Sequence, residues 1–351
     1  KVESLKQFLP QLKDANLVLF GAGMNGSFAY QRMKQEYKIC AFSDNNANFW
    51  KKSYEGLSVI EPNQLKEIPD IFVIITVTGQ YYLPIKKQLS EMKVPHMTYI
   101  EYQLASQFPQ FETVYQELLE DEFSKETYQS LLISHLTCER EYLRKIFVRN
   151  QYFEIPEFSI QTEDEIFVDC GAYTGDTLER FISVKAGCLK RIYSFEPTEK
   201  TYQALCIRKE RLLKEWALEE EQIITEKKIV TAKSGVEYFL KKGNGEKSNR
   251  IGIESLPESE PIIAISLDEY FAEKEEKPTF IKADIEGAEF GMLKGAEELI
   301  RSGKPLLAIC IYHRIEDLYE IPILLKQFRS DYKMSIRHHM PNYYETVLYC
   351  Y

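Results

Sequence analysis

Two predicted strands in the middle of the chain each end in an acid, and a glycine-rich turn follows the first of these strands. The apolar run that ends at Asp169 leads into a turn with Gly171 and Gly175. A helix is expected to begin directly after this turn, with Asp176 as its N-cap. The next apolar run ends in Glu196, which follows Gly175 by 21 residues (196 minus 175). Two strands that end in acids at this spacing predict a nucleoside-binding α/β fold.

The first acid bears on which nucleoside the turn would bind. A carboxylate beside the turn would repel a pyrophosphate, but it suits S-adenosylmethionine, which carries a sulfonium and an ammonium group. The glycines let the chain bend tightly against the ligand, and the helix start can bind the methionine carboxylate. The second acid can accept both ribose hydroxyls. The predicted cofactor-binding residues are Asp169, Gly171, Ala172, Tyr173, Thr174, Gly175, Asp176, Thr177 and Glu196. A tight turn that binds no ligand is the alternative.

Candidate catalytic groups follow two later apolar runs. Asp284 and Glu286 come directly after the run 279–283, and a helix is expected over 289–300. His313 directly follows the run 305–312. The carboxyl ends of parallel strands meet at one edge of a sheet, so these three side chains are expected to lie together. A histidine beside carboxylates can act as a general base for a hydroxyl, and a carboxylate can stabilise its protonated form. The same groups are ligand types for a divalent metal, but their spacing does not demand one and no metal is assigned. Acids favoured at a helix N-terminus and a loop histidine are the simpler alternatives.

A second glycine-rich turn lies near the start of the chain. Gly21, Gly23 and Gly26 form a GxGxxG turn after an apolar run, and Asp44 ends the next predicted strand. This arrangement is typical of dinucleotide-binding folds and could hold NAD or a nucleotide-sugar. No Tyr-xxx-Lys pair or Cys/His set accompanies the turn, which counts against an oxidoreductase. A scaffold that has lost its ligand and serves in dimerisation or acceptor positioning is the other interpretation, and a homodimer is one arrangement it would allow.

Composition excludes several classes of protein. The 351 residues carry a formal net charge of −10, so there is no basic surplus to neutralise the phosphates of a nucleic acid. No apolar run reaches the length of a membrane span. The seven cysteines are odd in number and lack a CxxC pair. They are expected to be reduced residues of a cytoplasmic protein.

Alternating strand and helix patterns divide the chain into three parts. Residues 1–100 predict a Rossmann-like domain, 101–160 a helical connector in which Ser124 caps one helix, and 161–351 a second doubly wound α/β domain. Its strands are predicted at 165–169, 191–195, 228–231, 262–266, 279–283 and 306–312. Segments 332–338 and 346–351 predict a closing antiparallel hairpin, a layout typical of class I methyltransferases. The charged stretch 213–260 gives no clear pattern, and residues 243–249 predict an exposed loop.

The second domain resembles the FkbM family of S-adenosylmethionine-dependent methyltransferases over roughly residues 160 to 351. Six ordered motifs carry the resemblance: 168–172, 195–197, 265–269, 281–289, Tyr312-His313 and 345–349. One departure is Thr198, where an acid often follows the Glu-Pro pair.

The family resemblance implies methyl transfer to a hydroxyl of a sugar, glycan or other small molecule. It implies His313 as the base, with Asp284 or Glu286 orienting the ring or the acceptor. Arg337, His338 and Glu345 flank the final hairpin and are candidates for acceptor binding. His339 would point to the opposite face from His338. An NAD- or nucleotide-sugar-dependent enzyme and a non-catalytic binding protein are the two other classes.

Overall fold

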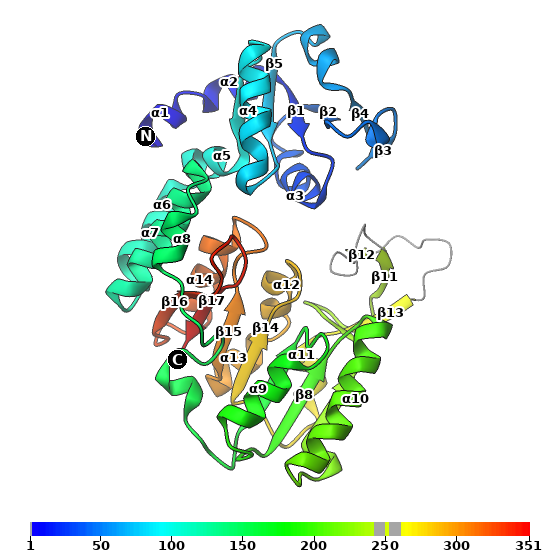
Figure 1. Ribbon diagram of the computed structural model, residues 1–351, viewed down its shortest axis with the longest axis vertical. Helices are drawn as coiled ribbons and strands as arrows, with labels where there is room; N and C mark the ends of the chain where they lie inside the picture. The colour runs from blue at the N-terminus through cyan, green and yellow to red at the C-terminus, as the bar shows by residue number, and fades with distance from the viewer. Residues whose placement is uncertain (1, 242–249, 253–260) are drawn as a thin grey trace.

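Two large β-sheets, each with helices packed on it, make up most of the protein. The computed structural model describes residues 2–241, 250–252 and 261–351 (Figure 1). The predicted loop at 243–249 lies outside the described residues. Both sheets are built mainly from parallel strands joined through helices, so the predicted α/β class is confirmed.

The N-terminal sheet has six strands in the order β3-β4-β2-β1-β5-β6. Its strands are β1 (Asn16–Phe20), β2 (Ile39–Ser43), β3 (Ser53–Tyr54), β4 (Leu57–Ile60), β5 (Ile71–Ile75) and β6 (His96–Thr98). Only β3 is antiparallel to its neighbour. The helices of this part are α1 (Val2–Lys6), α2 (Leu9–Asp14), α3 (Met24–Met33) and α4 (Tyr82–Glu91). The predicted strand-turn-helix at the GxGxxG sequence is therefore present as β1 and α3.

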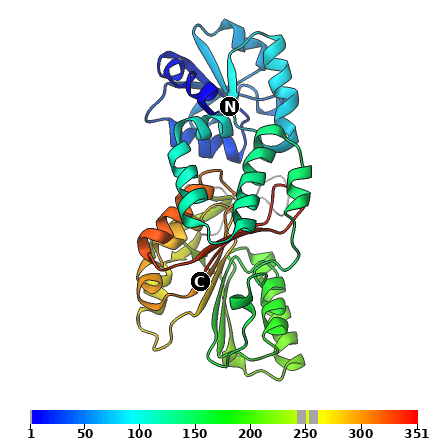
Figure 2. The ribbon, with the colours of Figure 1, turned by 90° about the vertical axis from the view of Figure 1, so that its left-hand side faces the viewer.

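Helices link the two sheets and pack against the C-terminal hairpin (Figure 2). They are α5 (Tyr99–Ser106), α6 (Phe108–Thr113), a π-helical turn at Val114–Leu118, α7 (Glu122–Thr137) and α8 (Glu141–Lys145). The prediction that Ser124 caps α7 is wrong. Asp121 is the N-cap, and its Oδ1 accepts a hydrogen bond of 2.8 Å from the Ser124 amide. An acid and a serine three residues apart offer two capping registers, and the structure uses the earlier one.

The C-terminal sheet has seven strands in the order β16-β17-β15-β14-β7-β8-β9. They are β7 (Ile166–Cys170), β8 (Arg191–Phe195), β9 (Ile223–Glu226), β14 (Phe280–Ala283), β15 (Leu306–Cys310), β16 (Met334–His338) and β17 (Thr346–Cys350). β16 and β17 form the predicted antiparallel hairpin, and β17 also runs antiparallel to β15. The order places β7 and β14 side by side at the centre, so the loops that follow them meet at one edge.

Alternate side chains of the central strands are buried on opposite faces of this sheet. Phe167 faces α9 (Asp176–Val184) and α10 (Glu199–Glu215), whereas Val168 faces the other layer. That layer consists of α7, α11 (Leu267–Ala272), α12 (Glu289–Lys294), α13 (Glu297–Gly303) and α14 (Asp317–Phe328). Strands that are apolar on both faces need helices on both sides, which explains the nearly continuous apolar runs of the sequence.

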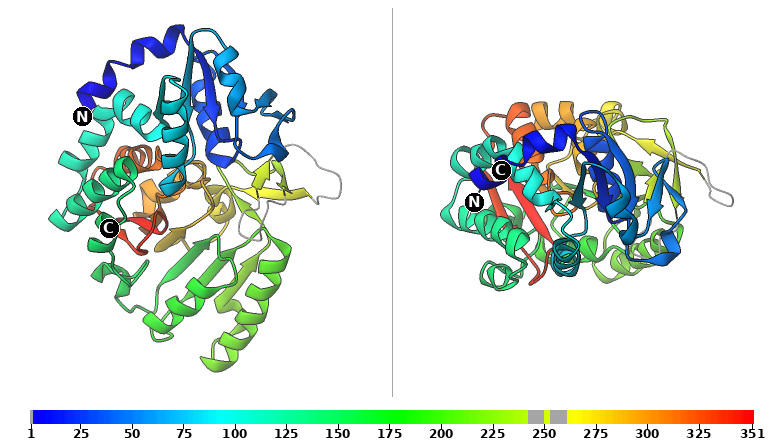
Figure 3. Two further views of the ribbon diagram at one scale, coloured as in Figure 1. Left: turned by 45° about the horizontal axis from the view of Figure 1, so that its top comes forward. Right: turned by 90° about the horizontal axis from the view of Figure 1, so that it is seen from above.

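Two of the predicted strands belong to a separate four-stranded sheet. Segments 228–231 and 262–266 form β10 (Ile229–Val230) and β13 (Pro261–Ile265), which join β11 (Glu237–Lys241) and β12 (Arg250–Gly252). These strands project at the side of the molecule (Figure 3). The prediction that both segments belong to the main sheet is wrong. The edge position is taken instead by β9, which sequence patterns do not distinguish because only its first residue is fully buried.

Two predicted helix boundaries also differ. The N-cap of α9 is Gly175 in the left-handed conformation (φ 82°), and Asp176 is the first helical residue. The helix predicted at 289–300 is two helices, α12 and α13, which are separated at Gly295. A Cβ at Gly295 would lie 2.2 Å from the Thr231 carbonyl oxygen. The small sheet therefore packs against the backbone at the break, which requires glycine there.

The carboxyl edge of the N-terminal sheet faces the C-terminal part of the chain. Phe28 of α3 lies under the Arg314 guanidinium at 5.4 Å from the ring centre, and a Cβ on Gly287 would lie 3.3 Å from the Phe28 ring. Arg32 of the same helix forms an ion pair with Glu320 of α14. Both glycine-rich turns therefore lie on edges that look towards the junction of the two sheets.

Candidate active site

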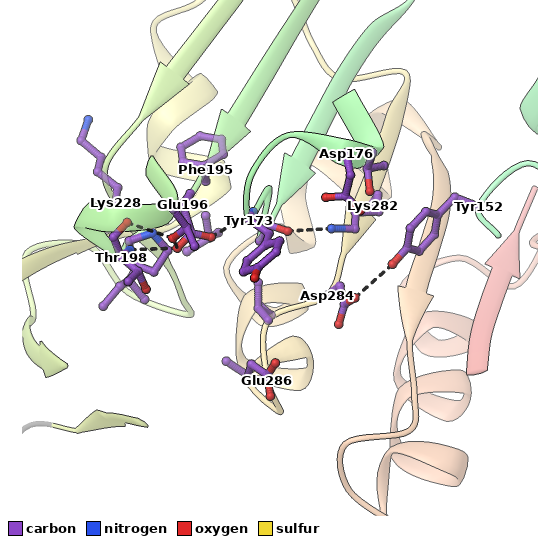
Figure 4. A pocket seen from close by; sticks show the side chains of 18 of the residues that line it. Tyr152, Tyr173, Asp176, Phe195, Glu196, Thr198, Lys228, Lys282, Asp284 and Glu286 are labelled. Atoms are coloured by element: carbon purple, nitrogen blue, oxygen red, sulfur yellow. Dashed lines mark hydrogen bonds between the residues drawn. The ribbon is translucent and has the colours of Figure 1, made fainter. Parts of the chain in front are cut away.

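A cavity of about 360 Å³ opens at the carboxyl edge of the C-terminal sheet. Its walls come from the loops after β7, β8, β14 and β15 and from the start of α9. Figure 4 shows the side chains that line it. The predicted residues among them are Gly171, Tyr173, Asp176, Thr177, Glu196, Asp284, Glu286 and Glu345. Residues from four separate segments therefore meet where an open α/β sheet binds its ligand.

The turn after β7 brings the backbone close to the loop after β14. Gly171 has φ 79°, and a Cβ there would lie 1.9 Å from the carbonyl oxygen of Asp284. Only glycine fits this position, since both its conformation and the available space exclude a side chain. Ala172 is buried, and neither it nor Thr174 is among the residues that line the cavity. They support the turn.

Asp169 does not line the cavity. Its carboxylate is fully buried at the end of β7, and its Oδ1 lies 2.9 Å from Nζ of Lys282. Lys282 also donates a hydrogen bond of 2.8 Å to the carbonyl of Gly171 and lines the cavity. Burial would lower the pKa of Lys282, but Asp169 and Asp284 raise it, so the lysine stays protonated. The prediction that Asp169 itself faces a cationic ligand is therefore wrong. Asp169 instead holds Lys282, which lines the cavity.

Glu196 lies where the sequence predicts it, at the end of β8 with its side chain at the cavity wall. It accepts hydrogen bonds from the amides of Tyr173 (3.0 Å) and Thr198 (2.9 Å) and from the hydroxyl of Thr201 (2.7 Å). Burial raises its pKa, and these donors oppose the rise. A carboxylate offers about four acceptor positions, so one remains for a ligand hydroxyl. Its three donors also fix its orientation.

The predicted catalytic residues form one cluster. Asp284 accepts hydrogen bonds of 3.1 Å from the hydroxyls of Tyr152 and Tyr312. Nε2 of His313 lies 3.5 Å from Oδ1 of Asp284 and 3.9 Å from Oε2 of Glu286. Figure 4 shows Asp284 with Tyr152 pointing at it and Glu286 further along the same loop. The expectation that consecutive strand ends bring these side chains together is met.

His313 is protonated in this environment. Burial alone would lower its pKa, but the carboxylates of Glu289, Asp284 and Glu286 outweigh burial and raise the pKa to about 10. The nearest is Glu289, whose Oε1 lies 2.9 Å from Nδ1. An imidazolium cannot accept a proton at neutral pH. The prediction that His313 is the general base is therefore disfavoured, and Asp284 becomes the better candidate.

The two basic residues of the final hairpin do not reach the cavity. Arg337 forms an ion pair with Asp121, 3.2 Å apart, on the side of the connecting helices. His338 is fully buried, and its Nδ1 lies 2.9 Å from the Thr346 hydroxyl. Nε2 of His339 lies 2.8 Å from the Tyr349 hydroxyl. Of the predicted hairpin residues, only Glu345 lines the cavity. The predictions for Arg337 and His338 as acceptor ligands are wrong, because the strand directs both side chains into internal contacts.

The buried histidines of the hairpin predict an acid-sensitive fold. Burial lowers the pKa of His338 and of His339 to about 4, whereas an unfolded histidine titrates near about 6.5. Between these values only the unfolded chain binds the protons, so stability should fall as pH drops from about 6.5 to about 4. The loss should be smaller in a His338→Gln variant. Thermal unfolding followed by circular dichroism across this window would test it, with His96→Gln as control. Equal pH dependence in both variants would contradict the assignment.

The N-terminal glycine turn holds its acid internally. The Asp44 carboxylate accepts hydrogen bonds from the amides of Ala22 (2.9 Å) and Asn46 (2.8 Å). A Cβ on Gly26 would lie 2.0 Å from the Gly21 carbonyl oxygen, so Gly26 serves the close packing of α3 on β1. Gly23 precedes α3 and has open space around it. These two hydrogen bonds fix the orientation of the Asp44 carboxylate within the loop.

Two stretches of the chain match known protein families. Residues 169–339 match the methyltransferase FkbM domain. This part of the chain is therefore similar to FkbM methyltransferase domains. Residues 13–100 match the C2185-like N-terminal domain. The predicted resemblance is thereby confirmed for residues 169–339, while the motif at 345–349 lies beyond the match.

Solved structures support the fold. The chain is similar over its whole length, and over 94% of the other chain, to a methyltransferase FkbM from Methylobacillus flagellatus KT, with 23% identity and a TM-score of 0.59. An rRNA methylase from Streptococcus thermophilus is 15% identical over 62% of this chain and 93% of its own, with a TM-score of 0.32. UDP-D-quinovosamine 4-dehydrogenase from Vibrio fischeri is 20% identical over 24% of this chain and 76% of its own, with a TM-score of 0.22. The last two scores are too low to carry an argument. No curated protein matched the sequence.

Several residues that shape the cavity carry no predicted role. Lys282, Tyr152, Tyr312 and Thr201 all contact a predicted site residue. Tyr312 directly precedes His313 and Lys282 lies two residues before Asp284, which is the one available signal. Tyr152 comes from the connecting segment, far from any motif, so no local pattern identifies it. Among the helices of the described residues, none combines the length and the apolar character that crossing a membrane requires.

Proposed function

We propose that the protein transfers the methyl group of S-adenosylmethionine to a hydroxyl of a sugar, glycan or other small molecule. The observation that carries the proposal is one cavity in which a glycine turn, a strand-end carboxylate and a catalytic cluster face each other. In this proposal Glu196 accepts one ribose hydroxyl. The turn at Gly171 lies against the methionine part, and the start of α9 offers amides to its carboxylate.

The charges of the site suit a cationic cofactor. Asp284, Glu286 and Glu345 all line the cavity, whereas Lys282 is paired with the buried Asp169. A cavity lined by carboxylates attracts a sulfonium, and solvent screens this attraction less in a cavity than on an open surface. The predicted preference for S-adenosylmethionine over a pyrophosphate ligand therefore rests on the whole carboxylate set rather than on Asp169 alone.

Methyl transfer at this site is an in-line displacement. The acceptor oxygen attacks the methyl carbon, the carbon–sulfur bond breaks and its electron pair remains on sulfur, which becomes a neutral thioether. The acceptor loses its hydroxyl proton, which we assign to the carboxylate of Asp284. The His313 imidazolium holds Asp284 and Glu286 in place. The cofactor supplies most of the driving force, and the protein supplies alignment and proton removal.

The chemical nature of the product tests this assignment. The protein would be incubated with S-adenosylmethionine labelled in the methyl group and a panel of sugars, nucleotide-sugars and sugar acids. We expect a labelled methyl ether, which survives mild alkali. A methyl ester would release labelled methanol under the same treatment, and a methylated amine would keep its label while gaining a basic group. Either of these products in place of an ether would overturn oxygen methylation of a hydroxyl.

A further inference from the structure

The catalytic cluster has the geometry of a cation site. Oδ1 of Asp284 and Nε2 of His313 lie 3.5 Å apart, and Oε2 of Glu286 lies 3.9 Å from the same nitrogen. Two ligand atoms that each bind an ion at about 2.1 Å, at right angles, are about 3 Å apart. The pair of Asp284 and His313 therefore needs only a small contraction to share one ion. The side chain of Glu286 is 58% exposed, so it has room to adjust.

Glu289 orients the histidine for this purpose. It lies fully buried at the start of α12, and its Oε1 is 2.9 Å from Nδ1 of His313 and accepts a 2.8 Å hydrogen bond from the Ile285 amide. A carboxylate on one ring nitrogen commonly fixes the tautomer of a histidine that binds metal through the other. Here that arrangement leaves Nε2 directed towards Asp284 and Glu286.

Two buried atoms of this cluster lack a hydrogen bond within the described residues. One is Nε2 of His313, whose side chain is only 4% exposed and whose nearest carboxylate oxygen, Oδ1 of Asp284, is 3.5 Å away. Oε2 of Glu289 is also buried without a hydrogen bond. Buried polar atoms are nearly always satisfied, and an absent ion or water is a usual reason for an exception. The cluster thus points to a ligand that the protein chain alone does not supply.

The backbone holds Glu286 in an uncommon conformation. Glu286 has φ 57° and Gly287 has φ 93°, so two successive residues are left-handed. A residue other than glycine in this region is uncommon, and such strain concentrates at functional sites. The turn directs Glu286 into the cavity beside Asp284. It therefore brings a second carboxylate to the site instead of extending α12 by one turn.

We infer that Asp284, Glu286 and His313 bind one divalent cation of the Mn²⁺ type, which displaces the Nε2 proton of His313 while Nδ1 keeps its proton towards Glu289. Two carboxylates and one imidazole suit Mn²⁺, which accepts oxygen ligands and tolerates nitrogen. The inference deepens the proposed function, because an ion here would bind the acceptor hydroxyl and make its proton easier to remove. Two other sets of ligand types share Asp284. One adds His313 and Glu289, but Glu289 already pairs with Nδ1 of the ring, and the other adds Glu345 and Cys310, a buried thiol. A thiol is a poor ligand for such a hard cation.

Electron paramagnetic resonance of Mn²⁺ tests the site without an acceptor. The sharp signal of free Mn²⁺ would be measured during titration of the full chain, with calorimetric binding of S-adenosylhomocysteine in parallel. We expect one Mn²⁺ per chain. His313→Gln and Glu286→Gln should each weaken Mn²⁺ binding at least about 10-fold. Glu286 is exposed, so its variant should fold even if the His313 variant does not. His96→Gln and Glu345→Gln are the matched controls.

The outcomes separate this inference from the proposed function. Loss of Mn²⁺ binding in the two site variants, with intact binding in both controls, supports the cation site. Binding of S-adenosylhomocysteine without any Mn²⁺ binding overturns the cation site and leaves the methyltransferase proposal standing. Equal weakening by Glu345→Gln also overturns it, since the ion would then lie at the other side of Asp284. If neither ligand binds, both proposals fail.

Discussion

Replacing Lys282 by methionine should lower the free energy of unfolding of the C-terminal part of the protein by about 3–5 kcal/mol. The Lys282 side chain is 2% exposed and the Asp169 side chain is fully buried, with 2.9 Å between Nζ and Oδ1. Methionine fills a similar volume but leaves the carboxylate without its counter-charge. A buried charge that loses its partner is among the most destabilising changes a single substitution can cause.

The measurement can be confined to the relevant half of the chain. The protein has two tryptophans, Trp50 beside the N-terminal sheet and Trp216 at the end of α10. In a Trp50→Phe background, fluorescence during urea unfolding reports on the C-terminal part. Lys228→Met is the control, because Lys228 lines the same cavity but pairs with Glu226 at a partly exposed position.

A double variant sharpens the test. Adding Asp169→Asn to Lys282→Met removes the uncompensated charge, so the double variant should be more stable than the sum of the two single effects predicts. The coupling should be roughly 1–3 kcal/mol. Strict additivity, or a Lys282→Met variant as stable as Lys228→Met, would show that the pair does not stabilise the turn.

Asp284→Asn should slow methyl transfer by roughly 10²–10⁴-fold, the range typical for loss of a positioned proton acceptor. The asparagine keeps the size of the side chain, and its oxygen can still accept from Tyr152 or Tyr312, but its amide cannot take the hydroxyl proton. The measurement is single-turnover transfer of labelled methyl to whichever acceptor yields the ether. Affinity for S-adenosylhomocysteine should change little, because this ligand lacks the methyl group.

Asp331→Asn is the matched control for this variant. Asp331 lies on the surface, paired with Arg329 far along the chain from the cavity motifs. A rate within a factor of a few of the unsubstituted protein is expected for it. If Asp284→Asn transfers methyl as fast as Asp331→Asn, proton removal by Asp284 is wrong.

The parts of the site that the sequence predicts well are those fixed by strand ends. Gly171, Glu196 and Asp284 each directly follow a strongly apolar run, and parallel strands necessarily bring those ends to one edge. The same reasoning places His313 beside Asp284. The turn at position 171 requires glycine, because it leaves no room for a Cβ.

Other features depend on contacts between distant segments. The partner of Asp169 is 113 residues away (282 minus 169) on the neighbouring strand, so its burial as an ion pair has no local signal. The proton on His313 depends on Glu289, which the macrodipole would also favour at the start of α12 for purely structural reasons. The roles predicted for Arg337 and His338 failed because strand alternation fixes which face a side chain takes but not what covers that face.

Calorimetric titration of the intact protein with S-adenosylhomocysteine tests the central claim most directly, alongside Glu196→Gln and Glu199→Gln. Glu196 lies in the cavity wall, whereas Glu199 is exposed one turn further on and forms an ion pair with Lys227. We expect the intact protein and Glu199→Gln to bind alike. Glu196→Gln should lose about 1.5–3 kcal/mol, or roughly 10- to 150-fold in affinity, since the charged acceptor of a ribose hydroxyl becomes neutral. Absence of binding by the intact protein, with NAD or a nucleotide-sugar bound instead, would contradict the account.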